Sequence, residues 1–251
     1  MPLDPALLTD YDLTVITGTV DRPAYFKKML VSIETHTPPV KWELIVADGS
    51  RPALKKTGAD NVTLLADQAR MGFSKALNRC ARRARGRWIA WFNDDVEVQP
   101  GWADRAIQFM DAHPEVGLGA FYWCDKRPPW KVEQAWGIVY ANFGIISRSL
   151  GDRIGWFDEE IRMYGADMAL TFRVLKAGKS VSPVPGARIL HHRADDAFRR
   201  SNATDQSYKR LVSKYNPWLG ELSRLSRTLP KPSLPLVIAV DILPGLKSGD
   251  S

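Results

Sequence analysis

The sequence predicts an α/β fold built on a single, mostly parallel sheet flanked by helices. Three observations support this prediction. Short apolar or β-branched runs alternate with helical patterns along the first half of the chain, an order typical of parallel sheets. Several of these runs end at acidic or turn-forming residues, where a strand would leave the sheet. With 251 residues, of which 45% are hydrophobic, the chain can form one large domain or two small ones.

The first half of the chain contains four strand signals and two helix signals. Pro23 lies near the first turn of the first helix, and Gly86 would end the second. The expected strands comprise residues 13–17, 42–47, 61–65 and 88–92, and the expected helices begin at Pro23 and span residues 73–85. Because helices separate most of these strands, the strands are expected to lie parallel.

The second half changes character after a helix that begins at Trp102 and ends near Pro114. Residues 125–130 are charged and contain prolines, as in loops that either cover a site or merely connect elements. Further strands are expected at 116–123, 139–146 and 187–192, and further helices after Tyr164 to about Ala177 and over 198–215. The proline-containing apolar tail from Leu229 is expected to pack on the domain, pair with another chain or touch a membrane.

The composition narrows the classes of partner. A formal net charge of +7 and a pI near 9.4 favour nucleotides, phosphates or an acidic membrane surface. Five arginines between Arg79 and Arg87 form either part of such a surface or one solvated helix face. Aromatic residues do not interleave them, so nucleic acid is not an expected partner.

The termini and the cysteines bear on location. The presence of only two cysteines argues against a disulfide framework and favours a reducing compartment. The first residues lack the pattern of a signal peptide, and no apolar run reaches the roughly 20 residues that a spanning helix needs. We therefore expect a cytoplasmic protein, either soluble or peripheral on the inner face of a membrane.

The most informative stretch is Asn93-Asp94-Asp95, which follows the buried run at 88–92. Ligand sites in open α/β sheets gather at the carboxyl ends of strands. Neighbouring carboxylates repel one another, and a hard divalent cation with oxygen ligands is one way to hold them together. Such a cation could neutralise a diphosphate. The alternative is an ordinary acid pair at the end of a strand.

Taken in chain order, several segments resemble a family 2 glycosyltransferase of the GT-A type over residues 13–192. They are the 17–22 loop, Asp48-Gly49-Ser50, the 71–74 segment with Asn78, Asn93-Asp94-Asp95, the 164–167 segment with Arg173, and His191. The resemblance implies a GT-A fold and the inverting transfer of a sugar from a nucleotide diphosphate donor to a hydroxyl acceptor, with Mn²⁺ or Mg²⁺ as cofactor.

By this resemblance, ten residues match the donor site of the family. Asp48 matches the acid that binds the nucleobase, where a carboxylate would accept from an imide N–H of uracil or thymine. Glycine at 72 would let the backbone approach the nucleotide, although a turn glycine is an equal alternative. The ten residues are Thr17, Asp21, Arg22, Asp48, Gly72, Phe73, Ser74, Asn78, Asn93 and Asp94.

Three further residues match the reacting centre. Asp95 and one of two adjacent histidines match the metal ligands, and Asp167 matches the catalytic base that takes the acceptor proton. Neighbouring side chains on a strand point opposite ways, so only one of His191 and His192 can face the site, and His191 fits the family's spacing better. The chain departs from the family pattern at Asn93 and Ala166, where acids are usual, and at Ala169, where a second Asp is common. Asp167 could also be an ordinary acid in the first turn of a helix.

The resemblance also implies an organisation and a role. A GT-A domain would cover residues 1–195, with a nucleotide-sugar half at about 11–97 and an acceptor half at about 98–195, and a helix and apolar tail would cover 196–251. The acceptor would be a saccharide or lipid-linked saccharide of bacterial cell-surface glycan, and the tail could mediate self-association. The alternatives are a degenerate family member that binds a sugar or a partner, and a sugar-phosphate nucleotidyltransferase, although Thr17-Gly18-Thr19 matches the glycine-rich loop of the latter poorly.

Overall fold

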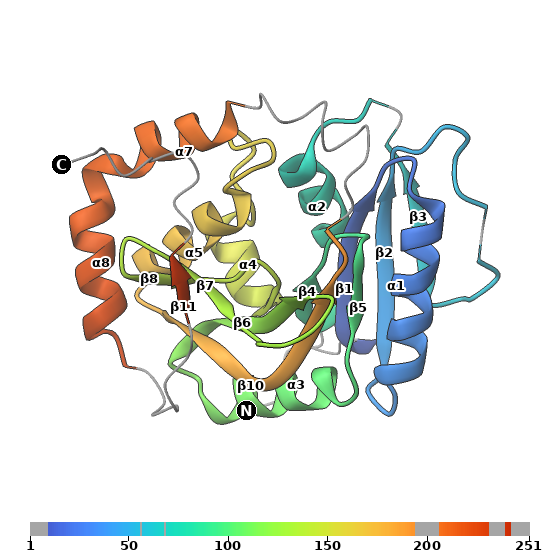
Figure 1. Ribbon diagram of the computed structural model, residues 1–251, viewed down its shortest axis with the longest axis horizontal. Helices are drawn as coiled ribbons and strands as arrows, with labels where there is room; N and C mark the ends of the chain where they lie inside the picture. The colour runs from blue at the N-terminus through green and yellow to red at the C-terminus, as the bar shows by residue number, and fades with distance from the viewer. Residues whose placement is uncertain (1–9, 56, 68, 194–205, 231–238, 242–251) are drawn as a thin grey trace, which may run out of the picture.

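A computed structural model describes residues 10–55, 57–67, 69–193, 206–230 and 239–241 (Figure 1). Its centre is an eight-stranded sheet. The strands in spatial order are β3 (Val62–Ala66), β2 (Trp42–Asp48), β1 (Tyr11–Thr19), β4 (Gly86–Trp91), β9 (Gly144–Ser147), β6 (Val116–Asp125), β10 (Ser180–His191) and β5 (Val96–Val98). Among them, β9 and β5 run against the other six. The predicted mostly parallel α/β sheet is therefore confirmed.

Helices cover both faces of this sheet, and a hydrophobic core lies under each layer. Helices α1 (Pro23–His36) and α3 (Trp102–Ala112) contribute Phe26 and Trp102 to one core. Helices α2 (Phe73–Ala81), α4 (Arg148–Ile154) and α5 (Ala166–Lys176) contribute to the other. The sheet is thus buried on both sides, which explains why its strands are continuous apolar runs in the sequence.

The C-terminal helices extend the second core. Helices α7 (Ser207–Tyr215) and α8 (Leu219–Thr228), joined by the 3₁₀ turn η2 (Asn216–Trp218), contribute Leu211, Tyr215 and Leu222 to it. Figure 1 shows α7 and α8 at the end of the molecule opposite α1 and β3. The predicted domain boundary at residue 195 lies outside the described residues, and none of the described helices is long and apolar enough to cross a membrane.

Several sequence predictions of local structure were wrong. The second helix ends at Ala81 rather than Arg85, because Arg83 and Ala84 donate to carbonyls three residues back in a tighter turn. The expected strand at 139–146 is two strands in different sheets. Strand β8 (Ile138–Tyr140) pairs with β7 (Val132–Ala135), which also pairs with β11 (Ala239–Asp241), whereas β9 belongs to the main sheet.

Other boundaries also differ. The last strand begins at Ser180, because its pairing with β6 continues across a register shift between Pro183 and Arg188. Strand β5 and helices α4 and α8 were not predicted. Of the expected helix at 198–215, the part before Gln206 lies outside the described residues.

A buried glutamate joins the centre of the sheet to the chain entering β4. Glu43 on β2 is 2% exposed, yet its oxygens accept from Thr14 Oγ1 at 2.8 Å and from the Arg85 backbone amide at 2.7 Å. Arg85 Nε and Nη2 add bonds at 3.0 and 2.8 Å. A buried carboxylate is tolerated when it is paired and hydrogen-bonded in this way.

Two glycines offer a matched test of this packing. An added Cβ at Gly86 would lie 2.7 Å from the Leu13 carbonyl carbon and closer still to the Thr14 amide, whereas one at Gly220 in α8 would meet nothing within 4 Å. We expect Gly86→Ala to lower the free energy of unfolding by about 2 kcal/mol or more and Gly220→Ala to raise it by about 0.5–1 kcal/mol. Urea denaturation measures both, and equal effects would contradict the close approach of β4 to β1.

Candidate active site

Loops after β1, β2 and β3 meet at the carboxyl end of the sheet, and Asp21 joins them. Its carboxylate accepts from the Arg51 backbone amide at 2.7 Å and pairs with Arg70 at 2.6 Å. The Arg51 hydrogen bond, together with the Arg70 charge, lowers the pKa of Asp21. Arg70 Nε also donates to the Gly49 carbonyl at 3.0 Å. This predicted donor-site residue therefore fixes the three loops relative to one another.

Asp48 has a similar structural task. It is 2% exposed, and its two oxygens accept from the backbone amides of Ser50 at 2.9 Å and Leu54 at 2.7 Å. The carboxylate thereby organises the loop that leaves β2. Contact with a nucleobase stays a prediction.

The two neighbouring acids after β4 have different surroundings. Asp94 is 3% exposed and accepts from Thr19 Oγ1 at 2.7 Å and from Arg22 Nη1 at 3.1 Å. Burial raises its pKa to about 6, against the opposing charge of Arg22. Two predicted donor-site residues, Arg22 and Asp94, thus form an ion pair. The acid pair has the cationic neighbour that the local sequence does not contain.

Asp95 faces His191 instead. His191 Nε2 lies 3.2 Å from Asp95 Oδ1, because β10 pairs with β5 in a register that sets His191 opposite Val96. The Trp123 and Phe143 rings pack against the imidazole in T-shaped pairs, with centroid distances of 5.5 and 5.2 Å. Strand β10 thus brings together the two residues that the sequence predicted as metal ligands.

His192 points elsewhere, as alternation along a strand requires. Its Nε2 lies 2.6 Å from Glu97 Oε1, and its backbone amide donates to the Asp95 carbonyl at 2.8 Å. Of the two adjacent histidines, His191 is therefore the one that faces Asp95.

The Asp95–His191 pair fits a divalent cation. Two ligands on an octahedral ion with bonds of about 2.1 Å lie about 3 Å apart, close to the 3.2 Å between these atoms. The described part of the chain contains no group of three or more His, Cys, Asp or Glu residues suited to a metal ion. Further ligands would therefore come from water or phosphate oxygens, as is usual for Mg²⁺.

Thr17 lies near the end of β1, and Asn93 directly precedes the two acids after β4. Thr17 is fully buried, and its hydroxyl donates to the Phe92 carbonyl at 2.9 Å, which ties β1 to the end of β4. Asn93 is partly exposed. Direct binding of a ligand by either side chain stays a prediction.

The predicted residues on α2 are directed toward the segment before α5. The Ser74 hydroxyl donates to the Ile161 carbonyl. Asn78 Nδ2 donates to the Phe157 carbonyl at 2.9 Å, and Asn78 Oδ1 accepts from the Phe157 amide at 3.0 Å. Both side chains are buried. They therefore join the two halves of the fold, and nucleotide contacts from them stay predictions.

Gly72 and Phe73 complete this junction. Gly72 has φ +93°, and an added Cβ would lie 3.1 Å from the Arg162 carbonyl oxygen. The Phe73 and Phe157 rings form a T-shaped pair at a centroid distance of 5.7 Å. Glycine at 72 is thus required by backbone conformation and close packing, whether or not a nucleotide approaches it.

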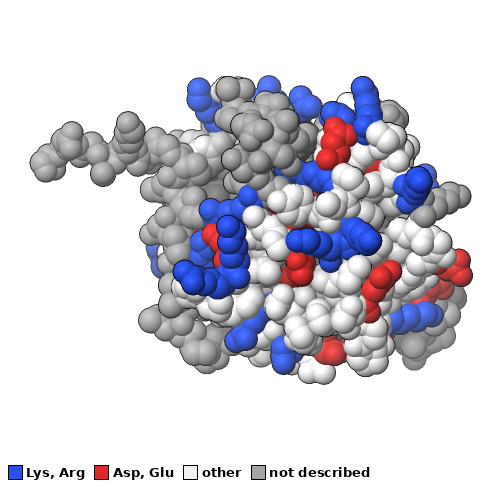
Figure 2. All heavy atoms as spheres, turned by 45° about the vertical axis from the view of Figure 1, so that its right-hand side comes forward, with Lys and Arg blue, Asp and Glu red and all other residues white. Residues whose placement is uncertain are grey.

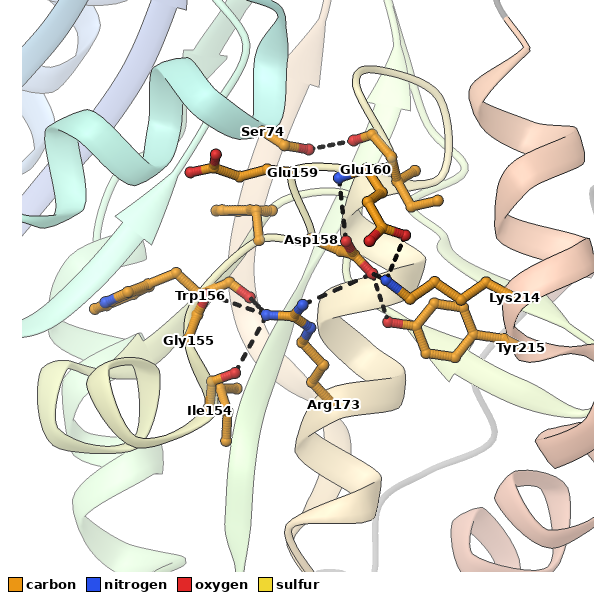
Figure 3. Close-up of polar contacts among 12 residues, drawn as sticks. Ser74, Ile154, Gly155, Trp156, Asp158, Glu159, Glu160, Arg173, Lys214 and Tyr215 are labelled. Carbon is orange, nitrogen blue, oxygen red and sulfur yellow. Dashed lines mark hydrogen bonds and ion pairs between the residues drawn. The ribbon is translucent and has the colours of Figure 1, made fainter.

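Asp158 anchors the loop between α4 and α5 (Figure 3). Its Oδ2 accepts from Lys214 Nζ at 2.8 Å and from the Tyr215 hydroxyl at 3.0 Å, and Arg173 Nη2 lies 3.7 Å away. Burial pushes the pKa of Asp158 up, but the Lys214 hydrogen bond and the other donors outweigh it, so the pKa is lowered. This buried carboxylate therefore ties helix α7 to the loop.

Arg173, part of the resemblance, completes the anchor from α5. Its Nη1 donates to the carbonyls of Ile154, Gly155 and Trp156 at 3.1–3.2 Å (Figure 3). These are orphan acceptors at and after the end of α4. These hydrogen bonds from Arg173 fix the position of α5, including its N-terminus, relative to the end of α4.

Asp167 lies in the first turn of α5, which begins after Gly165 in the left-handed conformation. Its Oδ1 accepts from the Met168 amide at 2.9 Å, and the residue is partly buried. Burial raises the pKa of Asp167 to about 6. A carboxylate in this range is mostly ionised at pH 7 and holds a proton more firmly than an ordinary aspartate, as suits a general base.

Sequence reasoning missed Glu133 on β7. The residue is 1% exposed, and burial is the main reason that its pKa is raised to about 7. The Asp167 charge adds to the rise. No local pattern marks Glu133, since Lys131 and Gln134 make the segment look like a polar loop. Only its pairing in the second sheet reveals it.

The arginines from Arg79 to Arg87 do not form one helix face, because α2 ends at Ala81. Arg85 pairs with buried Glu43, and Arg87 makes two bonds of 2.8 Å to Asp111. On the face shown in Figure 2, acidic side chains interleave the basic ones. The positive charge of the chain is thus distributed rather than gathered into a single patch there.

Comparison with known proteins identifies the family and the fold. The sequence model described as "Glycosyl transferase family 2" matches residues 14–173. The chain belongs to this family, and it has the GT-A fold that the sequence predicted.

Two curated relatives are informative. The chain is 24% identical to the O-antigen biosynthesis protein RfbC of Myxococcus xanthus over 83% of its own length and 19% of the relative. It is 23% identical to an N-acetylglucosaminyl-diphospho-decaprenol L-rhamnosyltransferase of Mycobacterium tuberculosis, over 82% of its length and 86% of the relative. It therefore spans about a fifth of RfbC but most of the mycobacterial protein.

Solved structures share the fold at low sequence identity. S. aureus TarS 1–349 in complex with UDP-GlcNAc superposes with a TM-score of 0.65 at 15% identity, over 86% of this chain and 70% of that one. The mannosyltransferase PcManGT from Pyrobaculum calidifontis, in complex with GDP-Man and Mn²⁺, gives 0.62 at 18%, over 87% and 70%.

Two acids that share Lys214 test the Asp158 anchor. Lys214 Nζ lies 2.8 Å from both Asp158 and Glu160, whose side chains are 3% and 73% exposed. We expect Asp158→Asn to lower the free energy of unfolding by about 2–4 kcal/mol, because the buried anion that accepts from Lys214 and Tyr215 loses its charge. Glu160→Gln should cost less than about 1 kcal/mol. Urea denaturation distinguishes the variants, and equal small losses would exclude Asp158 as the anchor of α7.

Proposed function

We propose that this protein is an inverting, metal-dependent glycosyltransferase that moves a sugar from a nucleoside diphosphate sugar to a hydroxyl group. Family membership gives the general class of reaction. The observation that carries the finer proposal is the 3.2 Å approach of Asp95 and His191 beside the ends of the parallel strands, since ligand sites of such sheets form there.

Asp167 is proposed as the general base. Its carboxylate takes the proton of the acceptor hydroxyl as that oxygen bonds to the anomeric carbon. The bond from this carbon to the diphosphate breaks, and its electron pair leaves with the diphosphate. Attack on the face opposite the leaving group inverts the anomeric centre. A pKa of about 6 leaves Asp167 mostly ionised at neutral pH.

Asp95 and His191 would hold Mn²⁺ or Mg²⁺. When bound, the cation would stabilise the negative charge that develops on the diphosphate. The loops joined by Asp21 and organised by Asp48 would support the nucleoside. The buried Arg22–Asp94 pair would hold the loop after β1 in a fixed position, so that little conformational freedom is lost on donor binding.

The relatives suggest the biological setting. One is an O-antigen biosynthesis protein, and the other transfers L-rhamnose to a lipid diphosphate-linked sugar, as their names state. We therefore propose a saccharide or lipid-linked saccharide acceptor in cell-surface glycan synthesis, met at the cytoplasmic face of a membrane. Most of the apolar tail lies outside the described residues, and its part in membrane contact or self-association stays a prediction.

A family member that binds without turnover is the second candidate. Ala166 and Ala169 replace acids beside the base, and Asn93 replaces the first acid before the metal ligand. The two candidates differ in one observable. Hydrolysis or transfer from a nucleotide sugar in the presence of manganese supports the enzyme, whereas donor binding without any product supports the binding protein.

Substitution of the proposed base gives a direct test. We expect Asp167→Asn to lower kcat by about 10²–10⁴-fold, because the amide cannot accept the proton, while donor affinity is retained. In the wild type, kcat should fall as the pH drops below about 6, where Asp167 becomes protonated. Steady-state kinetics between pH 5 and 8 measure both effects. Equal turnover by the two proteins would remove Asp167 from the mechanism.

The proposed metal site can be tested by thermal shift. A nucleotide at about 100 times its Kd adds about 2.7 kcal/mol, which should raise Tm by roughly 5–11 °C for this size. We expect a manganese-dependent rise in the wild type and its loss in Asp95→Ala. Glu97→Ala, which removes the neighbouring acid that contacts His192, is the control and should keep the rise. A shift that is the same in all three proteins would contradict the site.

A further inference from the structure

Glu133 is a buried carboxyl group for which the described residues provide no hydrogen bond. The residue is 1% exposed, and neither Oε1 nor Oε2 has a partner among these residues. Burying an ionisable group without partners destabilises a protein. Side chains of this kind occur where function rather than stability selects them.

The second sheet places Glu133 in the acceptor half of the molecule. Strand β7 lies between β8 and β11, and Glu133 is opposite Tyr140 across the β7–β8 pair. Helix α5, whose first turn carries Asp167, contacts β8. The charge of Asp167 acts on both Glu133 and Tyr140, raising the pKa of each. Glu133, Tyr140 and Asp167 therefore lie on neighbouring elements, since β7 pairs with β8 and β8 packs against α5.

Comparison with Glu43 shows that this chain can satisfy a buried glutamate. Glu43 is equally buried, and it accepts from Thr14 and from Arg85 at 2.7–3.0 Å. Glu133 has no such set of donors among the described residues. Its carboxyl group is therefore poorly explained as a structural ion. Its place on the strand that pairs with β8, against which α5 packs, puts it within range of the Asp167 charge and offers another explanation.

We propose that Glu133 is a positioning residue for Asp167, whose negative charge, when present, strengthens the hold of Asp167 on a proton. This inference rests on the proposed function, in which Asp167 is the base. Two carboxyl groups that interact in a buried site titrate as a pair rather than independently. Below about pH 7 Glu133 is mostly neutral, and above it a second negative charge acts on the base.

Other charged groups also face this pair. Lys131, which precedes β7, and Arg193, which follows β10, lower the pKa of Glu133, while Asp125 at the end of β6 raises it. Tyr208 on α7 acts on Tyr140. We assign the pH-dependent change to Glu133 and Asp167, and the variant Glu133→Gln removes the contribution of Glu133 alone.

The first experiment does not depend on activity. The ¹³Cγ chemical shift of Asp167 is followed against pH by NMR in the full chain. In the wild type the signal should report two ionisations, and in Glu133→Gln, which keeps the shape but cannot ionise, it should report one. Identical titration curves in the two proteins would overturn the proposal, whatever reaction the protein catalyses.

The dependence of Tm on pH distinguishes the proposed role of Glu133 from a purely structural one. The folded state holds Glu133 protonated up to about pH 7, whereas the unfolded chain loses this proton near 4.5, so stability falls as the pH rises between these values. Tm should therefore fall less between pH 5 and 8 in Glu133→Gln and Glu133→Met than in the wild type. At pH 8 the Tm of both variants should exceed that of the wild type. Glu43→Gln, the matched control, should melt below the wild type, and a similar loss at Glu133 would indicate a structural ion.

Kinetics then links the pair to turnover. Wild type and Glu133→Gln are compared with a nucleotide sugar that the wild type hydrolyses or transfers. The kcat of the wild type divided by that of Glu133→Gln should rise from near one at pH 5.5 to about three to ten at pH 8, with KM unchanged. Glu133→Asp should restore part of the lost turnover. A ratio independent of pH would overturn the proposal. A wild type without turnover would instead contradict the proposed enzyme, and the NMR titration would still decide the Asp167–Glu133 interaction.

Discussion

The antiparallel pairing of β5 with the end of β10 is the constraint on which the rest of the site depends. It sets His191 opposite Val96, next to Asp95, although the two strands are distant in sequence. Strand β10 can reach this position because its parallel pairing with β6 extends to His191 and Asp125 across an irregular register. A shift of one residue in either strand would turn His191 away and present His192 in its place.

Buried acidic side chains organise most of the remaining structure, and each forms ion pairs or hydrogen bonds with a different segment. Glu43 binds the arginine that precedes β4, Asp94 holds the loop after β1 through Arg22, and Asp158 joins a loop to α7. Every one of these partners lies far away in the sequence. Because a charge left alone in the interior is costly, these pairings favour one arrangement of loops over alternatives, and they leave the carboxyl end of the sheet preorganised.

The sequence predicted what depends on local periodicity and on the order of short motifs. Apolar runs located the central strands, and the alternation of side chains along a strand indicated that one histidine of the pair would face Asp95. What could not be predicted depends on contacts between distant segments. The 139–146 run has one continuous β-strand signal, yet Ala141–Phe143 carry the chain from the small sheet to the large one. Likewise, nothing near Asp94 indicates Arg22, and nothing near Glu133 indicates burial.

The Asp158 anchor has a consequence for how this enzyme family is divided into parts. The family match ends at residue 173, but Lys214 and Tyr215 complete the hydrogen bonds of a carboxylate inside the matched segment. A fragment cut where the family resemblance stops would retain every proposed donor-site residue while leaving this carboxylate without two of its donors. The matched segment therefore depends on contacts from helix α7 beyond its end, and chimeras that exchange C-terminal helices between relatives would need to exchange the 155–165 loop with them.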